Sequence, residues 1–350
     1  MQTNSTQTPN IGRRYLLHES IGEGGMGMVY RATDRLTGRV LALKRVLRDV
    51  NKLNGSNNTY DATDFRLAMA REFKLSASLR HPNIIKVLDY GFDDDRHPYY
   101  TMEYLPNART IVDAGQDFSL VDKVDLLIQT LNALAYLHRR GILHRDLKPA
   151  NILMLDNQVK VLDFGLSVMH EQTRQRGSES DTTAGTLAYI APELLMADDS
   201  GIPGDLYAIG MIAYELFAGQ HPFNLDSPGE LVQQIIYKTP DVDTLDLPLA
   251  LTEVLETLIE KDPKERYQSA EATLDALRGA IGHESNDDSH DIRDSYLRAA
   301  RLVGRDTELK QLSDALNDAT YQHGSAWLLA GENGVGKTRL MGELRRLAMV

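Results

Sequence analysis

The sequence predicts an α+β protein of two unequal lobes, a sheet-rich N-terminal lobe and a helical C-terminal lobe, followed by the start of a truncated α/β unit. Short segments between Tyr15 and Tyr104 are rich in β-branched and aromatic residues and are bounded by turn residues, which is typical of strands. From Leu120 to Ile281, apolar residues recur mostly at helical spacing. Strands that precede helices along the chain favour separate lobes.

The individual elements follow from the same patterns. In the N-terminal lobe we expect a helix at Phe65–Leu79 and strands at Tyr15–Ile21, Met28–Thr33, Val40–Leu47, Ile84–Tyr90 and Tyr99–Tyr104. In the C-terminal lobe we expect helices at Val121–Arg139, Pro203–Ala218, Pro228–Tyr237, Leu251–Glu260 and Ser269–Ile281. The Asn-rich stretch Asp49–Asp64 is predicted to be an exposed loop, either a docking element or a tolerated insertion.

Composition also indicates the domain boundaries and argues against some classes of binding partner. Residues 1–14 are predicted to be disordered, 15–281 to form the two lobes (15–105 and 106–281), 282–300 to be an acidic linker, and 301–350 to begin a second domain. The net charge of −12 argues against nucleic-acid and anionic-membrane partners. The chain has no cysteine, no signal peptide and no apolar stretch near the roughly 20 residues that cross a bilayer. We therefore expect a cytoplasmic protein.

A glycine-rich segment joins the first two predicted strands. Gly22, Gly24 and Gly27 allow backbone N–H groups to approach phosphates without an intervening side chain. Similar spacing occurs in dinucleotide-binding folds, but there the glycines open a helix. Here a strand begins at Met28, which favours a hairpin that covers phosphates.

Lys44 lies in the third predicted strand, within Ala42-Leu43-Lys44. A lone lysine in a strand is usually a surface charge, but Glu72 in the following helix is a candidate partner. Their ion pair would hold Lys44 against the α- and β-phosphates of a nucleotide. Taken alone, Glu72 is interpreted as part of a solvated helix face.

Three further motifs follow in order. They are His144-Arg145-Asp146-Leu147-Lys148-Pro149-Ala150-Asn151, then Asp163-Phe164-Gly165, then Ala191-Pro192-Glu193. With the glycine segment and Lys44, they resemble the signature set of the protein kinase superfamily, and in particular its bacterial eukaryotic-like (Hanks-type) Ser/Thr members. The resemblance covers roughly Tyr15 to Ile281 and implies the bilobal protein kinase fold.

The resemblance implies a role for each motif residue. Phosphoryl transfer requires positioned groups and neutralised charge rather than much covalent chemistry. Asp146 would accept the proton of the substrate hydroxyl, and Lys148 would stabilise the transferred group. Asn151 and Asp163 would hold Mg²⁺, with Mn²⁺ as an alternative, beside ATP.

An adenine site is implied in the same way. Met102 would stand behind the ring, and the backbone of Glu103 and Leu105 would hydrogen-bond its edge. The side chains expected to enclose the ring are those of Ile21, Val29, Ala42 and Leu153.

The sequence around Lys148, and Gly185-Thr186 further on, resemble the Ser/Thr class, which implies protein substrates. Two interactions implied by the resemblance are structural rather than catalytic. Glu193 is expected to pair with Arg266, and Asp205 is expected to anchor the backbone around His144.

Arg145 directly precedes Asp146, which resembles kinases that are activated by phosphorylation of the activation loop. Thr182 or Thr183 is the hypothesised autophosphorylation site, because these residues lie nearest Gly185-Thr186. Self-association would then serve autophosphorylation between two copies. The other hydroxyls of the loop are Ser178 and Ser180, and the alternative is a flexible polar loop without a phosphosite.

A second nucleotide-binding motif lies near the end of the sequence. A predicted buried strand, Trp327–Ala330, leads into a P-loop and a predicted helix, Arg339–Ala348. Lys337 would reach the β- and γ-phosphates and Thr338 would bind Mg²⁺, in a loop shaped by Gly331 and Gly336. With Val303-Gly304-Arg305, the segment resembles the start of an AAA-like or signal-transduction ATPase. We expect it to be incompletely folded or packed on the kinase, as a fragment of a longer signalling protein.

Three other functions compete with protein phosphorylation. A pseudokinase scaffold would be expected to lack Lys44, Asp146, Asn151 or Asp163, and all four are present. A small-molecule kinase of related fold generally lacks the Gly-Thr…Ala-Pro-Glu segment, which shapes a peptide groove. An NTP-driven switch that uses the kinase lobe as its sensor is left open for a longer protein.

Overall fold

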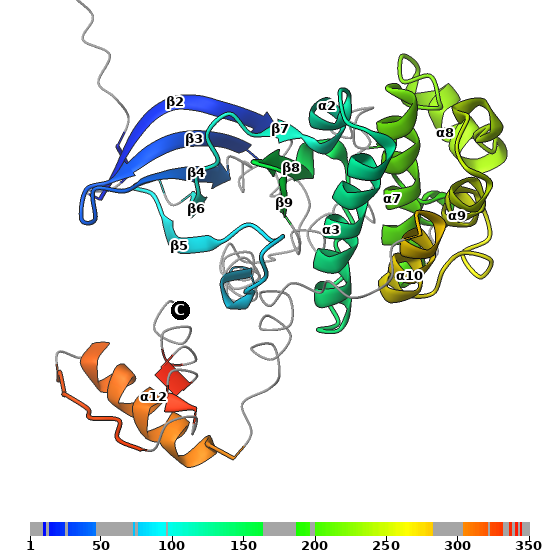
Figure 1. The fold of residues 1–350 in the computed structure, drawn as a ribbon. Helices are drawn as coiled ribbons and strands as arrows, with labels where there is room; N and C mark the ends of the chain where they lie inside the picture. The colour runs from blue at the N-terminus through cyan, green and yellow to red at the C-terminus, as the bar shows by residue number, and fades with distance from the viewer. Residues whose placement is uncertain are drawn as a thin grey trace, which may run out of the picture. The chain divides into compact units, whose positions relative to one another are not determined.

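The computed structural model describes residues 10–11, 14–24, 27–46, 73, 76–95, 97–163, 187–196, 200–282, 304–320, 323–331, 336–337, 340–341 and 344. The chain divides into two compact units, Met1–Arg80 with Lys86–Glu103 and Arg293–Val350, and His81–Ile85 with Tyr104–Ile292. The first contains the main sheet and the second most of the helices (Figure 1). The predicted α+β fold, with a sheet-rich N-terminal lobe and a helical C-terminal lobe, is confirmed.

The N-terminal sheet is antiparallel and six-stranded, in the order β1-β2-β3-β4-β6-β5. Its strands are β1 (Asn10–Ile11), β2 (Tyr15–Gly24), β3 (Gly27–Asp34), β4 (Val40–Val46), β5 (Val87–Phe92) and β6 (Pro98–Glu103). The fourth predicted strand begins three residues later than expected, because Ile84 instead bridges to Val161 of the second unit.

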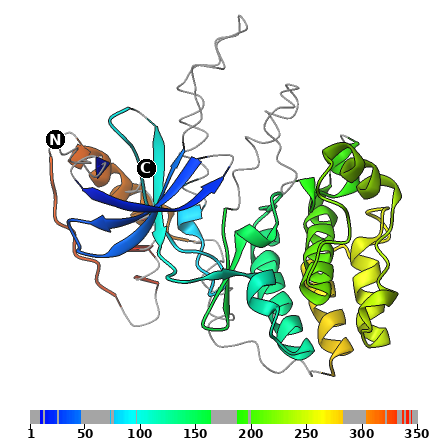
Figure 2. The ribbon, with the colours of Figure 1, turned by 90° about the horizontal axis from the view of Figure 1, so that it is seen from above.

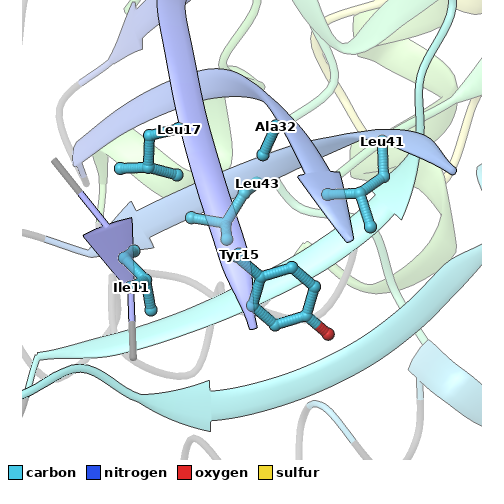
Figure 3. Packing of buried hydrophobic residues seen from close by; sticks show 6 residues of the cluster. All are labelled: Ile11, Tyr15, Leu17, Ala32, Leu41 and Leu43. Carbon is cyan, nitrogen blue, oxygen red and sulfur yellow. The ribbon is translucent and has the colours of Figure 1, made fainter. Parts of the chain in front are cut away.

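One face of this sheet carries an apolar cluster. Ile11, Tyr15, Leu17, Ala32, Leu41 and Leu43 lie together there, as Figure 3 shows. Leu41 and Leu43 reach this face because alternate residues of a strand share one side. Ala42 and Lys44 therefore point to the other side of β4, where both are also buried.

Asn10 and Ile11 form a strand, although the sequence predicts disorder over residues 1–14. Ile11 lies within the stretch expected to be disordered, yet it is only 4% exposed, because β1 pairs with β2 and places its side chain on the apolar cluster. The guanidinium of Arg14 donates hydrogen bonds to Asp34 and Asp89. The phenol of Tyr15 donates to Asp89 as well, so this network ties β2 to β3 and β5.

The second unit is built mainly from helices. They are α2 (Ile111–Gly115), α3 (Leu120–His138), α6 (Pro192–Leu195), α7 (Gly201–Ala218), α8 (Pro228–Tyr237), α9 (Leu249–Ile259) and α10 (Ala270–Ala280), with 3-10 turns η2 (Pro149–Asn151) and η3 (Asp243–Leu245). The hydroxyls of Ser119, Ser227 and Ser269 cap α3, α8 and α10, which fixes where these helices begin. Helix α3 packs on α7 and α10, and α7 packs on α9 (Figure 2).

A small sheet of β7 (Arg109–Thr110), β8 (Ile152–Leu155) and β9 (Gln158–Val161) completes this unit. The turn between β8 and β9 consists of Asp156 and Asn157, whose φ angles of 50° and 59° suit a two-residue hairpin. The segment His81–Ile85 belongs to this unit because the Ile85 N–H donates to the Val161 carbonyl and Asn83 donates to the Val159 carbonyl.

The C-terminal segment contains α12 (Asp306–Thr320). The strand expected at Trp327–Ala330 is absent: residues 323–331 form no strand, and Leu328 is 92% exposed. A strand needs a neighbour to satisfy its N–H and C=O groups, and no strand of the described residues pairs with this one. The predicted loop Asp49–Asp64 and the linker 283–300 lie outside the described residues. Among the described helices, none has the length and apolarity that a membrane span requires.

Candidate active site

The glycine segment forms a hairpin between β2 and β3. Gly22 pairs with Val29, and Gly24 pairs with Gly27 at the tip. Gly27 has a φ of 143°, a conformation that favours glycine. A strand, and not a helix, follows the glycines, which is the feature that separates this loop from a dinucleotide-binding turn. Ile21, just before the hairpin tip, is 42% exposed.

Lys44 is buried, at 7% exposure, in the middle of the sheet. It lies opposite Val29 on β3 and Tyr100 on β6, and its Nζ is 5.9 Å from the centre of the Tyr100 ring. Ala42 lies opposite Met102. Because residues directly opposite each other share a face, Val29, Ala42, Lys44 and Met102 lie on one face of three neighbouring strands.

Two hydrogen bonds to Lys86 fix Glu103, the last residue of β6. The Glu103 N–H donates to the Lys86 carbonyl, and the Glu103 carboxylate accepts from the Lys86 N–H. Leu105 belongs to the second unit, and Glu72 lies outside the described residues.

Within the second unit, three motif residues gather around one carboxylate. Lys148 Nζ lies 3.1 Å from Asp146 Oδ2 and 3.2 Å from Oδ1. Asn151 Nδ2 donates to the Asp146 carbonyl at 2.7 Å and to its Oδ2 at 3.0 Å. The Asp146 side chain stays 20% exposed between these partners. The arrangement can therefore offer a carboxylate acceptor to a hydroxyl group.

A buried carboxylate holds the backbone just before Asp146. Asp205 accepts the N–H groups of His144 and Arg145, each at 2.8 Å, as the sequence predicts. Burial acts to raise the pKa of Asp205, but hydrogen bonds from His138 and His144 outweigh it and keep that pKa below its usual value. These bonds hold Arg145 at a φ of 61°, a strained conformation for a residue other than glycine.

His138 is a site residue that the sequence analysis missed. Its Nε2 donates to Asp205 Oδ2 at 2.9 Å, and both side chains are at most 3% exposed. No local motif marks this histidine, because its partner lies 67 positions away in the sequence. His144, by contrast, belongs to the recognised motif and is fully buried, with its Nε2 2.9 Å from the Leu162 carbonyl oxygen.

The two candidate metal ligands are brought together by the β8–β9 hairpin. The Leu162 N–H donates to the Asn151 carbonyl, which places the neighbouring Asp163 beside Asn151. Asp163 has a φ of 55°. The pair offers an amide oxygen and a carboxylate, which are the hard ligands that Mg²⁺ prefers. Leu153, in β8, lies opposite Thr110 of β7 and Lys160 of β9.

Another group of metal-ligand type lies in the β5–β6 turn, formed by Asp93, Asp95 and His97. Arg45 fills it: its Nε donates to Asp93 and its Nη2 lies 3.0 Å from Asp95. A bound guanidinium neutralises these carboxylates, so the cluster is an ion-pair network rather than a metal centre.

The segment around Ala191-Pro192-Glu193 is anchored in the helical core. Glu193 and Arg266 form the predicted ion pair, which is buried. Four residues before Glu193, Tyr189 donates its hydroxyl to Glu215. The hydroxyl-bearing loop residues Ser178, Ser180, Thr182 and Thr183 lie outside the described residues.

In the C-terminal P-loop, Lys337 Nζ donates to the Gly331 carbonyl at 2.7 Å, and Gly336 has a φ of 88°. Thr338 lies outside the described residues.

Two family models match the chain, the protein kinase domain over residues 15–276 and the AAA ATPase domain over residues 301–349. A Streptomyces coelicolor protein named probable serine/threonine-protein kinase is 34% identical over 271 residues, which are 75% of this chain and 39% of that protein. A Corynebacterium glutamicum protein named probable serine/threonine-protein kinase PknB is 34% identical over 290 residues, 78% of this chain and 44% of that protein.

Serine/threonine-protein kinase PknA of Mycobacterium tuberculosis is 33% identical over 281 residues, 77% of this chain and 63% of that protein. The chain thus spans less than two thirds of each of these three relatives. Among solved structures, a mutant of the kinase domain of Mycobacterium tuberculosis PknI has a similar fold, with a TM-score of 0.56 and 24% identity, covering 79% of this chain and 98% of that one.

Proposed function

Because the chain belongs to the protein kinase family, we propose that it transfers the γ-phosphoryl group of ATP to Ser and Thr hydroxyls of protein substrates. The observation that carries the proposal is the grouping of Lys148 and Asn151 around the Asp146 carboxylate. That grouping holds the carboxylate in place and leaves it partly exposed, as a group that accepts a hydroxyl proton must be.

Each side chain then has one task. Asp146 orients the substrate hydroxyl and accepts its proton, while the ammonium of Lys148 stabilises charge on the transferred group. Lys44 holds the α- and β-phosphates, and Glu72 would pair with it. Gly22, Gly24 and Gly27 supply backbone N–H groups to the phosphates.

The adenine would lie against the sheet face that carries Val29, Ala42 and Met102, because these apolar side chains flank Lys44. We propose that the backbone of Glu103 and Leu105 binds the edge of the ring. Ile21 and Leu153 would complete the enclosure.

Members of this family use ATP with a divalent metal ion. The residues present fit Mg²⁺, because Asn151 commits its Nδ2 to Asp146 and so presents its oxygen as the ligand, beside the carboxylate of Asp163. When bound, the ion would neutralise charge on the phosphates; Mn²⁺ would serve the same ligands.

We also propose the wider organisation that the sequence predicts. The kinase domain would span 15–281, with lobes 15–105 and 106–281, and 282–300 would link it to a nucleotide-binding unit that begins at 301. The match to the AAA ATPase domain supports a phosphate-binding role for Gly331, Gly336, Lys337 and Thr338. The protein would work in the cytoplasm, and two copies would associate to phosphorylate Thr182 or Thr183.

Transfer of label from γ-labelled ATP to a generic protein substrate tests the proposal. The full chain is assayed as wild type and with Asp146→Asn, Lys44→Met and, as the matched control, Lys337→Ala in the second P-loop. Wild type and Lys337→Ala should transfer label to Ser and Thr, and Asp146→Asn should lower kcat by about 10²–10⁴-fold. Equal signal in all four proteins, or label on Tyr, would contradict the proposal.

Autophosphorylation is tested separately by mass spectrometry after incubation with ATP. Phosphate on Thr182 or Thr183 is expected in the wild type and not in Asp146→Asn. A wild-type chain without phosphate between Gly165 and Gly185 would refute this part of the proposal.

A further inference from the structure

We propose that His221 is a positioning residue for the peptide substrate, which ties the backbone at Ala188 to the turn after α7. This inference rests on the proposed kinase function and adds a residue outside its motifs. Ala188 lies between the predicted phosphorylation loop and Ala191-Pro192-Glu193, in the segment that would shape the peptide groove. His221 follows α7 and is 33 positions away from Ala188 in the sequence.

The imidazole makes a contact at each of its two nitrogens. Nε2 lies 3.1 Å from the Ala188 carbonyl oxygen. A carbonyl oxygen can only accept, so Nε2 carries the proton and donates it. Nδ1 lies 3.2 Å from the backbone N–H and 3.2 Å from the carbonyl of Phe223. The ring therefore links two backbone segments that are distant in the sequence.

Ring packing fixes the orientation of this link. The His221 ring is 5.3 Å from the Tyr189 ring at 81°, and 5.8 Å from the Phe223 ring at 67°. Both contacts are edge-to-face, which is the favoured arrangement of aromatic pairs. An imidazole held between two rings points its Nε2 in one direction only.

The turn at Phe223, which His221 contacts through Nδ1, is held in place by its own contacts. Phe223 is 4% exposed, and Lys261 Nζ lies 5.4 Å from the centre of its ring. The same ammonium donates to the Ile235 carbonyl in the last turn of α8, at 2.7 Å. His221 thus connects the Ala188 segment to a turn that is held by α8 and by the chain after α9.

The hydrogen bond from His221 also satisfies the buried carbonyl oxygen of Ala188. Ala188 is fully buried, so its carbonyl oxygen would lose a partner if His221 were replaced by an apolar residue. The next residue, Tyr189, donates its hydroxyl to Glu215. Burial lowers the pKa of His221, although Glu215 acts in the opposite direction, so the ring is neutral at pH 7. A neutral ring can donate from Nε2 and accept at Nδ1 together.

The test is peptide phosphorylation by the full chain with His221→Leu, His221→Gln, His221→Asn and the control Gln220→Ala at the exposed neighbour. Gln can place an amide N–H near the position of Nε2 and keep the bond to Ala188, whereas Asn ends near Nδ1 and cannot. We expect His221→Leu and His221→Asn to raise the KM for a Ser/Thr peptide about tenfold, the effect of losing one buried hydrogen bond. The KM for ATP should stay unchanged in all four variants.

His221→Gln should keep the peptide KM within about threefold of wild type, and Gln220→Ala should leave it unchanged. If His221→Leu fails to fold, the peptide KM values of His221→Gln and His221→Asn still test the proposal. Equal peptide KM values for Gln and Asn, or a parallel rise in the KM for ATP, would overturn the role of His221. A wild-type chain without Asp146-dependent transfer would instead refute the kinase function and this inference with it.

Discussion

Arg266 and Glu193 form a bidentate ion pair across 73 positions of sequence, with Nη1–Oε1 and Nη2–Oε2 distances of 2.8 and 2.7 Å. Their side chains are 0% and 5% exposed. Arg266 also donates to the carbonyls of Glu260, Pro203 and Lys261, so each of the three guanidinium nitrogens donates a hydrogen bond. The pair fixes Ala191-Pro192-Glu193 to the chain between α9 and α10.

We predict that Arg266→Met lowers the free energy of unfolding by about 3–5 kcal/mol, because it leaves a buried carboxylate without its partner. Urea titration of the full chain measures this change. The control is Arg139→Ala, which removes an ion pair with Glu271 whose side chains are 54% and 38% exposed; its expected cost is below about 1 kcal/mol. Similar costs for the two variants would contradict the assignment of Arg266 as a buried anchor.

Gly210 sets the distance between α7 and α9. A Cβ at this position would lie 2.7 Å from Ile259 Cγ2, 2.8 Å from Leu258 Cβ and 3.2 Å from the Leu258 carbonyl carbon. A helix backbone cannot move aside cheaply, so Gly210→Ala should destabilise the protein by about 1–3 kcal/mol.

The matched control is Gly279→Ala in α10, where an added Cβ would meet no atom within 4 Å. Alanine costs less than glycine in an open helix position, so this variant should gain about 0.5–1 kcal/mol. Thermal melts followed by circular dichroism compare the two. If both substitutions shifted Tm in the same direction, the packing of α7 on α9 would not be the cause.

His81 should make stability depend on pH. Burial lowers its pKa to about 4, and the charge of Lys160 acts in the same direction. Its Nδ1 accepts the Asn83 N–H, which requires a deprotonated nitrogen. The unfolded chain binds a proton near pH 6.5 while the folded chain does not, so stability present above that pH is lost as pH falls.

The expected loss from His81 between pH 7 and pH 5 is about 2 kcal/mol. The measurement is the free energy of unfolding at both pH values for the wild type and for His81→Asn, whose side chain does not titrate. The wild type should lose about 2 kcal/mol more than the variant over this interval. Parallel curves would show that His81 does not titrate differently in the two states.

Asp205→Asn tests the anchor of the catalytic loop. The amide would turn an N–H group toward donors that now point at Asp205, namely those of His144, Arg145 and His138. Because a shift of about 1 Å in a catalytic group can cost 10²-fold, kcat should fall about 10²-fold while the KM for ATP changes little. Steady-state kinetics measures both, and an unchanged kcat would rule out this positioning role.

Most of the helices and strands that the sequence predicts between Tyr15 and Ile281, and that the structure describes, begin and end within about three residues of the expected bounds, because their hydrophobic periodicity is strong and serine caps mark several starts. Helix α8, for example, spans Pro228–Tyr237 as expected. The β8–β9 hairpin was missed: its strands are four residues each, and only the turn Asp156-Asn157 signals them. The strand predicted at Ile84–Tyr90 begins only at Val87, because Ile84 belongs to the second unit and bridges to Val161 of that same unit.

The motif residues of the site were recognisable because phosphoryl transfer restricts residue type and spacing. His138 and His221 were not, since each acts through a hydrogen bond to a residue far away in the sequence. The strand expected at Trp327–Ala330 failed for a related reason. An apolar run indicates burial, but a strand forms only where another strand pairs with it.

We infer that Lys44, Asp146, Asn151 and Asp163 serve one metal-bound nucleotide. The most direct test of this inference is ATP binding by calorimetry, with and without Mg²⁺, using the full chain with Lys337→Ala so that the second P-loop does not contribute. We expect one ATP site per chain, with an affinity that depends on Mg²⁺ and that Lys44→Met and Asp163→Asn each weaken at least about tenfold. Binding that is absent, independent of Mg²⁺, or unaffected by both substitutions would contradict this inference.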